Sequence, residues 1–388
     1  MLRASSKVVM LLLTALLCAT SGCDVAVGAV YAMTNASSGN EIVVYERAHD
    51  GTLTFARSVS TGGLGSGGAA PLEPVDALGS QSPLLLSQDA RWLVAVNAGS
   101  NELSVFRVRD SHLELTDKVD SGGLFPASVT LQGGRLYVLN SGGDGNITGF
   151  HLQEDGHLMP IPGSTRSLGA GGTQPPFFLV SPAQVGFDPS GGFLVVTIKG
   201  TNRLLVFQVG SEDVPSDTPV VTEASGSTPF GLTFTAQGHL LVAEAFGQAT
   251  VGTPNAGAVS SYDLRSDGPL QRVSVSVANL QTATCWIATT PNGRFAYTAN
   301  NGSNTISGYQ VQSSGELALI DESGAVGSTE QNPVDLAITR DGRFVYAVNA
   351  GSGTVSMYRI NLESGQLTGL GAVGGLPVRD GAVGIAAQ

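Results

Sequence analysis

The chain has 388 residues, of which 42% are hydrophobic and only 13% are charged. This apolar content is enough for a large core and excludes a wholly disordered chain. The net charge is −12, and the sequence contains only three lysines, Lys7, Lys118 and Lys199. A nucleic-acid backbone needs a basic protein face, so nucleic acid is not expected as a partner.

Residues 1–23 have the pattern of an export signal. Arg3 and Lys7 provide a positive start, an apolar run of ten residues follows at 8–17, and small residues lead to Cys23. A run of this length is too short to span a membrane, which takes about 20 residues. No second run of comparable length follows in the sequence, so no membrane span is predicted for the mature chain.

The end of this leader, Thr20-Ser21-Gly22-Cys23, resembles a bacterial lipobox. The resemblance implies cleavage before Cys23 and attachment of lipid to its thiol, which would be the only membrane contact of the chain. We therefore expect an exported lipoprotein of the cell envelope. Ordinary secretion into the periplasm or the medium stays open as the alternative.

Internal repetition is the strongest signal after the leader. The unit at 333–377 divides into four short strands at 335–339, 344–348, 354–360 and 367–370, joined by turns rich in Gly, Asp, Asn and Ser. Such turns supply the backbone conformations of tight hairpins. The unit therefore predicts a four-stranded antiparallel sheet.

Seven copies of the second strand and its turn recur about every 52 residues, within the range of propeller blades. A position that is usually Asn marks them, at residues 35, 97, 140, 199, 244, 300 and 349. The second strands are unbroken apolar runs, as expected of strands buried on both faces. We predict an all-β, seven-bladed β-propeller that forms one domain over residues 29–388. The unequal intervals place insertions in the outer loops, and an open stack of sheets is the alternative fold.

The two ends of the repeat region predict how the ring closes. The first copy begins directly at its second strand, residues 29–33, and the last copy is followed by residues 381–387, which resemble an innermost strand. The C-terminal strand would complete the N-terminal blade and leave no strand edge open.

Propeller geometry places a binding site at the mouth of the central channel. The starts of the innermost strands and the turns after the second strands converge there. The innermost strands contribute Ser128, Gln184, Phe230, Cys285, Trp286 and Asp335.

Lys199 and Glu244 break the Asn pattern in successive repeats, and each brings a charge to a place where the fold needs only a turn former. They are the candidate catalytic residues, and a mutual salt bridge is the structural alternative. For Asn97, Asn140 and Asn349 the alternative to ligand binding is turn formation, since Asn tolerates the left-handed conformation. For Trp286 the alternative is packing in the channel.

The runs PAQVGFDPSGGFLVVTIKGTNR, TPFGLTF and AVNAGSN resemble the lactonase family of seven-bladed propellers. That family includes bacterial 6-phosphogluconolactonases and fungal carboxymuconate cyclases, and the resemblance extends over residues 29–388. Active members carry a His, an Arg-His pair, a Glu and an Arg around the channel. The corresponding positions here are Ala183-Gln184, Pro229-Phe230, Glu244 and Asn301, so only the Glu is retained.

The resemblance implies hydrolysis of a lactone or related cyclic ester at the top of the channel. Glu244 would deprotonate the attacking water, and Lys199 would hold the oxyanion or a substrate carboxylate. The predicted substrate-binding residues are Gln184, Asn140, Asn300, Asn301, Trp286, Asn97 and Asn349. The alternative is a non-catalytic propeller that binds a small molecule or a protein at the same face. No cofactor and no metal are expected.

Overall fold

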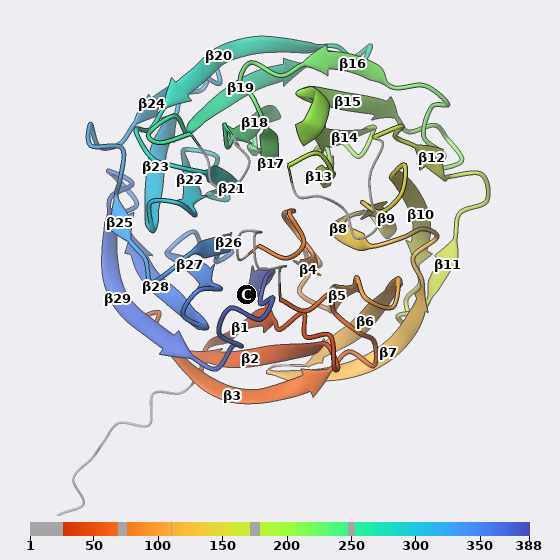
Figure 1. The fold of residues 1–388 in the computed structure, drawn as a ribbon, viewed down its shortest axis with the longest axis horizontal. Helices are drawn as coiled ribbons and strands as arrows, with labels where there is room; N and C mark the ends of the chain where they lie inside the picture. The colour runs from red at the N-terminus through yellow and green to blue at the C-terminus, as the bar shows by residue number, and fades with distance from the viewer. Residues whose placement is uncertain (1–25, 69–75, 110, 171–178, 247–252) are drawn as a thin grey trace, which may run out of the picture.

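Seven antiparallel sheets stand around a central axis like the blades of a propeller (Figure 1). This computed structural model describes residues 26–68, 76–109, 111–170, 179–246 and 253–388. In that part of the chain every regular element is a strand except one short 3-10 helix, η1 (Lys199–Thr201). The predicted all-β propeller with seven blades is confirmed.

Each blade has an innermost strand beside the axis and a second strand paired with it. The innermost strands are β30 (Ile385–Ala387), β4 (Leu84–Leu86), β8 (Pro126–Gln132), β13 (Pro182–Phe187), β17 (Pro229–Phe234), β21 (Thr284–Thr289) and β26 (Pro333–Ile338). The second strands are β1 (Gly28–Met33), β5 (Trp92–Asn97), β9 (Arg135–Asn140), β14 (Phe193–Ile198), β18 (His239–Glu244), β22 (Phe295–Asn300) and β27 (Phe344–Asn349).

The third and outer strands complete the sheets. The third strands are β2 (Glu41–Arg47), β6 (Glu102–Arg109), β10 (Asn146–Leu152), β15 (Arg203–Gln208), β19 (Ala258–Leu264), β23 (Thr305–Val311) and β28 (Thr354–Ile360). The outer strands are β3 (Leu53–Ser60), β7 (His112–Asp120), β11 (Leu158–Pro160), β12 (Arg166–Ser167), β16 (Val220–Glu223), β20 (Leu270–Ala278), β24 (Leu317–Leu319), β25 (Gly327–Ser328) and β29 (Leu367–Gly374). We number the blades I to VII in chain order, so that blade I holds β1 to β3 and blade VII holds β26 to β29. The upper face is the one at which the innermost strands begin and the second strands end.

The two ends of the chain meet in blade I. β30 pairs with β1 in the sheet order β3-β2-β1-β30, with Tyr31 opposite Ala386. The backbone of Met33 extends the pairing through hydrogen bonds with Val383 and Gly384. The C-terminal strand therefore completes the first blade, as predicted, and the edge of β1 is covered.

Burial explains why these sequences form these strands. Every residue of β5, β22 and β27 is buried, because a second strand is covered by the neighbouring blade on each face. The outer strand β7 instead alternates between exposed and half-buried residues. The continuous apolar runs in the sequence are thus the second strands, whose side chains pack against the neighbouring blades.

The longest interval between repeats, before blade II, shows one correction to the predicted loops. Residues 76–82, just before β4, lie inside the ring and not in an outer loop (Figure 1). We call them the channel segment. Their sequence, DALGSQS, is too short and polar to signal burial by its pattern alone.

The predicted export signal at 1–23, with Cys23, lies outside the described residues. Within the described ranges no helix has the length and apolar character required to cross a bilayer.

Candidate functional site

The upper end of the channel is filled by the channel segment. The Ser80 hydroxyl donates to the carbonyl of Ala127 in blade III at 2.7 Å. The backbone N–H of Gln81 donates to the carbonyl of Ala183 in blade IV at 3.2 Å. The Gln81 side chain forms two bonds with Ile287 in blade VI, accepting from its N–H at 2.9 Å and donating to its carbonyl at 2.7 Å. The segment therefore connects the innermost strands of three blades across the axis.

Two predicted substrate-binding residues hold this segment. The Trp286 indole N–H donates to the Ser80 carbonyl at 2.8 Å, and its ring packs edge-on against Phe230 with centroids 5.1 Å apart. The Gln184 amide donates to the Ser82 hydroxyl at 3.3 Å and accepts from the Leu232 N–H at 2.6 Å. Both side chains are buried, so the chain itself occupies the place predicted for a ligand.

The fit of the segment depends on a glycine in blade V. A Cβ atom at Gly231 would lie 1.9 Å from Oε1 of Gln81 and 2.7 Å from the carbonyl oxygen of Cys285. Only glycine leaves room for the Gln81 side chain at this point. The innermost strand of blade V and the channel segment are therefore matched in shape.

The strand register corrects the predicted position of Lys199. In blade IV Ile198, not Lys199, pairs with the first residue of the next strand, Arg203, in the way that Asn97 pairs with Glu102 in blade II. Lys199 lies one position further along the chain. A one-residue shift turns a side chain to the other side of a strand, so Lys199 enters the channel while the repeated Asn enters the blade.

Lys199 is only 2% exposed. Its Nζ donates a hydrogen bond to the Gly79 carbonyl of the channel segment and lies 4.7 Å from the centroid of the Phe230 ring. Burial lowers the pKa of this lysine, and the carboxylate of Asp76 partly offsets the effect. A buried ammonium is therefore held by a neutral carbonyl and an aromatic face.

Asp76 begins the channel segment and is also buried. Its Oδ1 accepts from the Gly79 N–H at 3.0 Å. Burial raises the pKa of this carboxyl, and attraction to Lys199 and the backbone donors lower it in part. No direct ion pair within 4 Å joins these two described side chains, so they interact through space.

Asp335, at the start of β26, is the most unusual residue of the channel. Its φ of 72° lies in the left-handed region, its side chain is buried, and its Oδ2 has no hydrogen-bond partner. Its Oδ1 accepts from the Leu336 N–H at 2.9 Å. Burial raises the pKa of Asp335 to about 7; the backbone N–H groups of Leu336, Ile385 and Ser82 lower it in part, and Asp76 adds a small rise. Backbone strain, an unpartnered buried oxygen and a raised pKa together are typical of a functional carboxyl.

The thiol of Cys285 is a further titratable group in the channel. It is buried, and burial raises its pKa well above the ordinary value. Burial likewise disfavours the charged forms of three neighbouring groups, Asp76, Lys199 and Asp335. We call these three residues the channel cluster.

Glu244 points into blade V and away from this cluster. It is fully buried and accepts three hydrogen bonds, from the Gly226 N–H at 2.8 Å and from the hydroxyls of Ser260 and Ser276 at 2.6 Å each. Burial raises the pKa of the Glu244 carboxyl, and these donors lower it in part. The shared opening expected for Lys199 and Glu244 is corrected by these contacts. The role of Glu244 as a base stays a prediction.

The repeated Asn residues connect strands within their own blades. Asn97 donates to Ser104 at 2.8 Å, Asn300 to Ser307 at 2.9 Å and Asn349 to Ser356 at 2.8 Å. Each serine lies two positions into the third strand, as does Ser260, the residue that donates to Glu244. Asn140 donates instead to the Ser121 carbonyl and to Asn146, at 3.1 and 2.8 Å.

These four asparagines are buried, and none of them has a positive φ. The left-handed residue of the same turn is a later one, such as Asn101 with φ 59° or Asn304 with φ 55°. For these four residues the turn-forming explanation applies to the end of the turn, and the marker Asn fastens the blade; the first marker, Asn35, has a φ of 50° and is itself a turn residue. Asn301, one position past the marker like Lys199, donates to the Pro333 carbonyl of the next blade at 3.2 Å.

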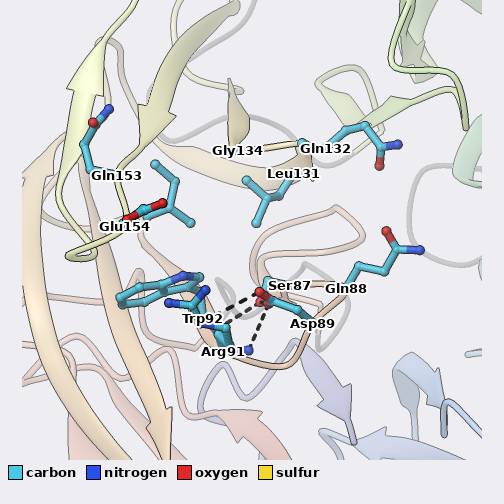
Figure 2. Close-up of a pocket in the computed structure, with 12 residues that line it drawn as sticks. Ser87, Gln88, Asp89, Arg91, Trp92, Leu131, Gln132, Gly134, Gln153 and Glu154 are labelled. Atoms are coloured by element: carbon cyan, nitrogen blue, oxygen red, sulfur yellow. Dashed lines mark hydrogen bonds and ion pairs between the residues drawn. The ribbon is translucent and has the colours of Figure 1, made fainter.

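Two other cavities lie away from these residues. Figure 2 shows a pocket of about 430 Å³ between blades II and III, where Asp89 is bound by Ser87 and Arg91 beside the buried Trp92. The equivalent place between blades IV and V holds a pocket of about 700 Å³ beside His239. None of the predicted site residues lines either pocket. Among the residues the structure describes, no group of three His, Cys, Asp or Glu side chains is arranged to hold a metal ion.

The sequence analysis missed Asp76 and gave Asp335 no role. Asp76 lies in an insertion between repeats, so no repeated position drew attention to it. Asp335 did carry a signal, because it is the one carboxylate among the residues expected at the starts of the innermost strands. Its strain and its missing partner depend on the packed ring.

Comparison with known proteins supports the fold over almost the whole chain. The model of the lactonase family of seven-bladed β-propellers matches residues 39–167 and 66–378. No curated protein matches the sequence.

Several solved structures share the fold at low sequence identity. A candidate 6-phosphogluconolactonase from Bacteroides uniformis has 21% identity and a TM-score of 0.71, with 93% of this chain and 99% of that chain covered. The periplasmic gluconolactonase of Pseudomonas aeruginosa has 20% identity and a TM-score of 0.66, with 92% and 99% covered. A hypothetical selenium-binding protein from Sulfolobus tokodaii has 12% identity and a TM-score of 0.63, with 93% of each chain covered. At such identities the likeness concerns the fold, which hosts more than one function.

Proposed function

The chain belongs to the lactonase family of seven-bladed β-propellers, and from this membership we propose that it hydrolyses a lactone at the upper end of its central channel, with the channel cluster as the reacting site. The observation that supports the proposal most is the carboxyl group of Asp335. A general base works best when its pKa is close to the working pH, and burial raises the pKa of Asp335 to about 7. Glu244, the base expected from the family, is instead engaged by three donors inside blade V.

Lys199 has the properties needed to stabilise the oxyanion. Its Nζ already donates to a carbonyl oxygen, that of Gly79, in surroundings where water is excluded. A buried donor aimed at a carbonyl becomes more effective as negative charge develops on the oxygen. We propose that the lactone carbonyl replaces the Gly79 carbonyl when the channel segment moves aside.

The reaction then has two steps. Asp335 takes a proton from water while the water oxygen bonds to the acyl carbon, and the carbonyl electron pair moves onto the oxygen beside Lys199. The ring C–O bond then breaks as the carbonyl re-forms, and protonated Asp335 returns the proton to the departing alkoxide. The product is the open hydroxy acid, and every group of the protein recovers its starting state.

The test is hydrolysis of δ-gluconolactone, followed by proton release, with the mature chain and three variants. Asp335→Asn keeps the size of the side chain, suits a positive φ and removes the base, so we expect a loss of roughly 10²- to 10⁴-fold in kcat. Lys199→Met should also lower kcat. Asp341→Asn, in an exposed turn of the same blade, keeps its Oδ1 acceptor and should retain wild-type turnover.

Glu244→Gln separates this proposal from the family expectation. If Glu244→Gln abolishes turnover while Asp335→Asn retains it, the base is Glu244 and the channel cluster is not the reacting site. The folding of each variant is checked by circular dichroism and thermal melting.

A second function is favoured by the channel segment itself. Because residues 76–82 fill the mouth and engage Gln184, Trp286 and Lys199, the chain suits a propeller that binds a small molecule or a protein at its upper face without catalysis. Absence of turnover with gluconolactone, 6-phosphogluconolactone and muconolactone, together with a ligand-induced rise in melting temperature, would favour this function.

We also propose that the chain is exported and anchored through lipid on Cys23, on the evidence of its leader sequence. Globomycin blocks processing of lipoprotein precursors, so accumulation of the precursor is the expected result. Unchanged processing would favour ordinary secretion.

A further inference from the structure

The lower part of the channel holds a cavity of about 330 Å³ with Gln81 among its lining residues. Residues at the ends of the innermost strands form its wall. Several of these residues, such as Thr233, Ala288 and Ile338, are half-buried. Neither Asp76, Lys199 nor Asp335 lines it. It is therefore separate from the channel cluster.

The chemistry of the wall is the opposite of that of the channel cluster. Among the residues the structure describes, no ionisable side chain lines the cavity; Leu85, Phe187 and Phe234 are among the larger lining side chains, and polar atoms make up the greater part of the exposed wall. A charged ligand would lose its hydration here without finding a counter-charge. The net charge of −12 disfavours an anion further.

The polar groups of the wall are hydroxyls and amides. Thr233 and Thr289 bring their hydroxyl oxygens within 3.3 Å of each other, from blades V and VI. The hydroxyl of Thr130 in blade III accepts from the Phe187 N–H at 3.0 Å, a bond that does not use its own proton. Thr289 already donates to the Phe234 carbonyl at 3.2 Å, so its oxygen can accept from a ligand hydroxyl, while the Thr130 hydroxyl can donate to a ligand oxygen.

We infer that the lower cavity is a second binding site, which takes a compact uncharged molecule that carries a hydroxyl or carbonyl oxygen. Its volume lies at the small end of the range for ligand sites, which begins at about 300 Å³. A few placed polar groups of the wall fix the orientation of such a ligand. The site is independent of hydrolysis at the upper end.

The test compares three probes that share one ring: cyclohexanol, cyclohexanecarboxylate and cyclohexylammonium. Binding to the full mature chain is titrated by ligand-observed NMR. Cyclohexanol is expected to bind, and each charged probe to bind at least roughly tenfold more weakly, because its charge would be buried without a partner. Equal binding of a charged probe, or no binding of cyclohexanol, would overturn the inference.

Two variants localise the binding. Ala288→Trp fills the cavity and should abolish binding of cyclohexanol, while Ala278→Trp, at the exposed end of β20, should leave it unchanged. Thr289→Val keeps the shape of the wall and removes one hydroxyl, so the affinity should fall roughly three- to tenfold. If Ala288→Trp fails to fold, Thr289→Val decides the matter, and unchanged affinity in that variant overturns the inference.

Discussion

Blades IV and V end their second strands in different ways, and the difference determines where each charge lies. In blade V the last residue of β18, Glu244, faces the third and outer strands and accepts three hydrogen bonds. In blade IV the last residue of β14 is Ile198, and the charge comes one residue later, at Lys199, which faces the channel. A shift of one residue along similar strands thus separates a group that fastens a blade from a group that lines the axis.

The two environments differ in how they hold a charged group. The blade interior gives the Glu244 carboxylate three donors and gives the marker Asn residues acceptors on the neighbouring strand, although the Oδ1 atoms of Asn140 and Asn349 have no partner. The channel leaves Oδ2 of Asp335 without a partner and keeps Lys199 on a single neutral carbonyl. A charged group is therefore better satisfied inside blade V than in the channel, where it is held at a cost to stability, as is common at functional sites.

The largest effect that tests this contrast is the pH dependence of stability at Asp335. An aspartate in an unfolded chain titrates near pH 4, and burial raises the pKa of Asp335 to about 7. Between these values the unfolded chain releases a proton that the folded chain retains, so the free energy of unfolding falls as pH rises. At about 1.4 kcal/mol per pH unit the loss over this window is about 4 kcal/mol, and it is complete above pH 7.

Asp335→Asn should remove this dependence. Urea unfolding at pH 4.5 and pH 8 is the measurement, and the wild type should lose stability between the two relative to the variant. Parallel curves for the two proteins would mean that Asp335 does not hold its proton, and the contrast between channel and blade would fail at this residue.

The next effect concerns the interior of blade V. Glu244→Ala leaves the donors of Gly226, Ser260 and Ser276 buried without an acceptor, so the free energy of unfolding should fall by about 3 kcal/mol. The matched variant is Asn301→Ala, which loses the bond to the Pro333 carbonyl and a long one from the Asn332 amide at 3.5 Å, and should cost about 1 kcal/mol. Equal losses in denaturant titrations at pH 7 would contradict the assignment of Glu244 to a fastening role.

The smallest expected change in the free energy of unfolding tests how tightly the channel segment packs against blade V. Gly231→Ala would bring a methyl group against Gln81 and should cost about 2 kcal/mol, as overpacked cores do. Gln81→Ala alone loses the two bonds to Ile287 but provides the missing room. The double variant should therefore be more stable than the sum of the single losses predicts, because the clash with Gln81 has gone and only the contact with the Cys285 carbonyl remains. Strict additivity would indicate that Gln81 does not occupy this place in solution.

The sequence alone was sufficient for the architecture. Hydrophobic runs, turn residues and a regular order of strands and turns specify each blade locally. The third strand of blade VII, for example, has the predicted limits, Thr354–Ile360. Closure was also predictable, because the missing innermost strand of the first blade has a counterpart at 381–387. These features are local or involve the two ends of one repeat, so the pattern of residues determines them.

The candidate site depended on the tertiary structure. Whether residue 198 or 199 ends the strand decides which side chain enters the channel, and the pairing of Ile198 with Arg203 decides it. The bonds between Gln81 and Ile287 join residues 206 positions apart, which no local pattern encodes. The raised pKa of Asp335 arises from desolvation by the surrounding blades, so only the closed ring creates it. Periodicity therefore determined which strands form, and packing around the axis decided which charges meet there.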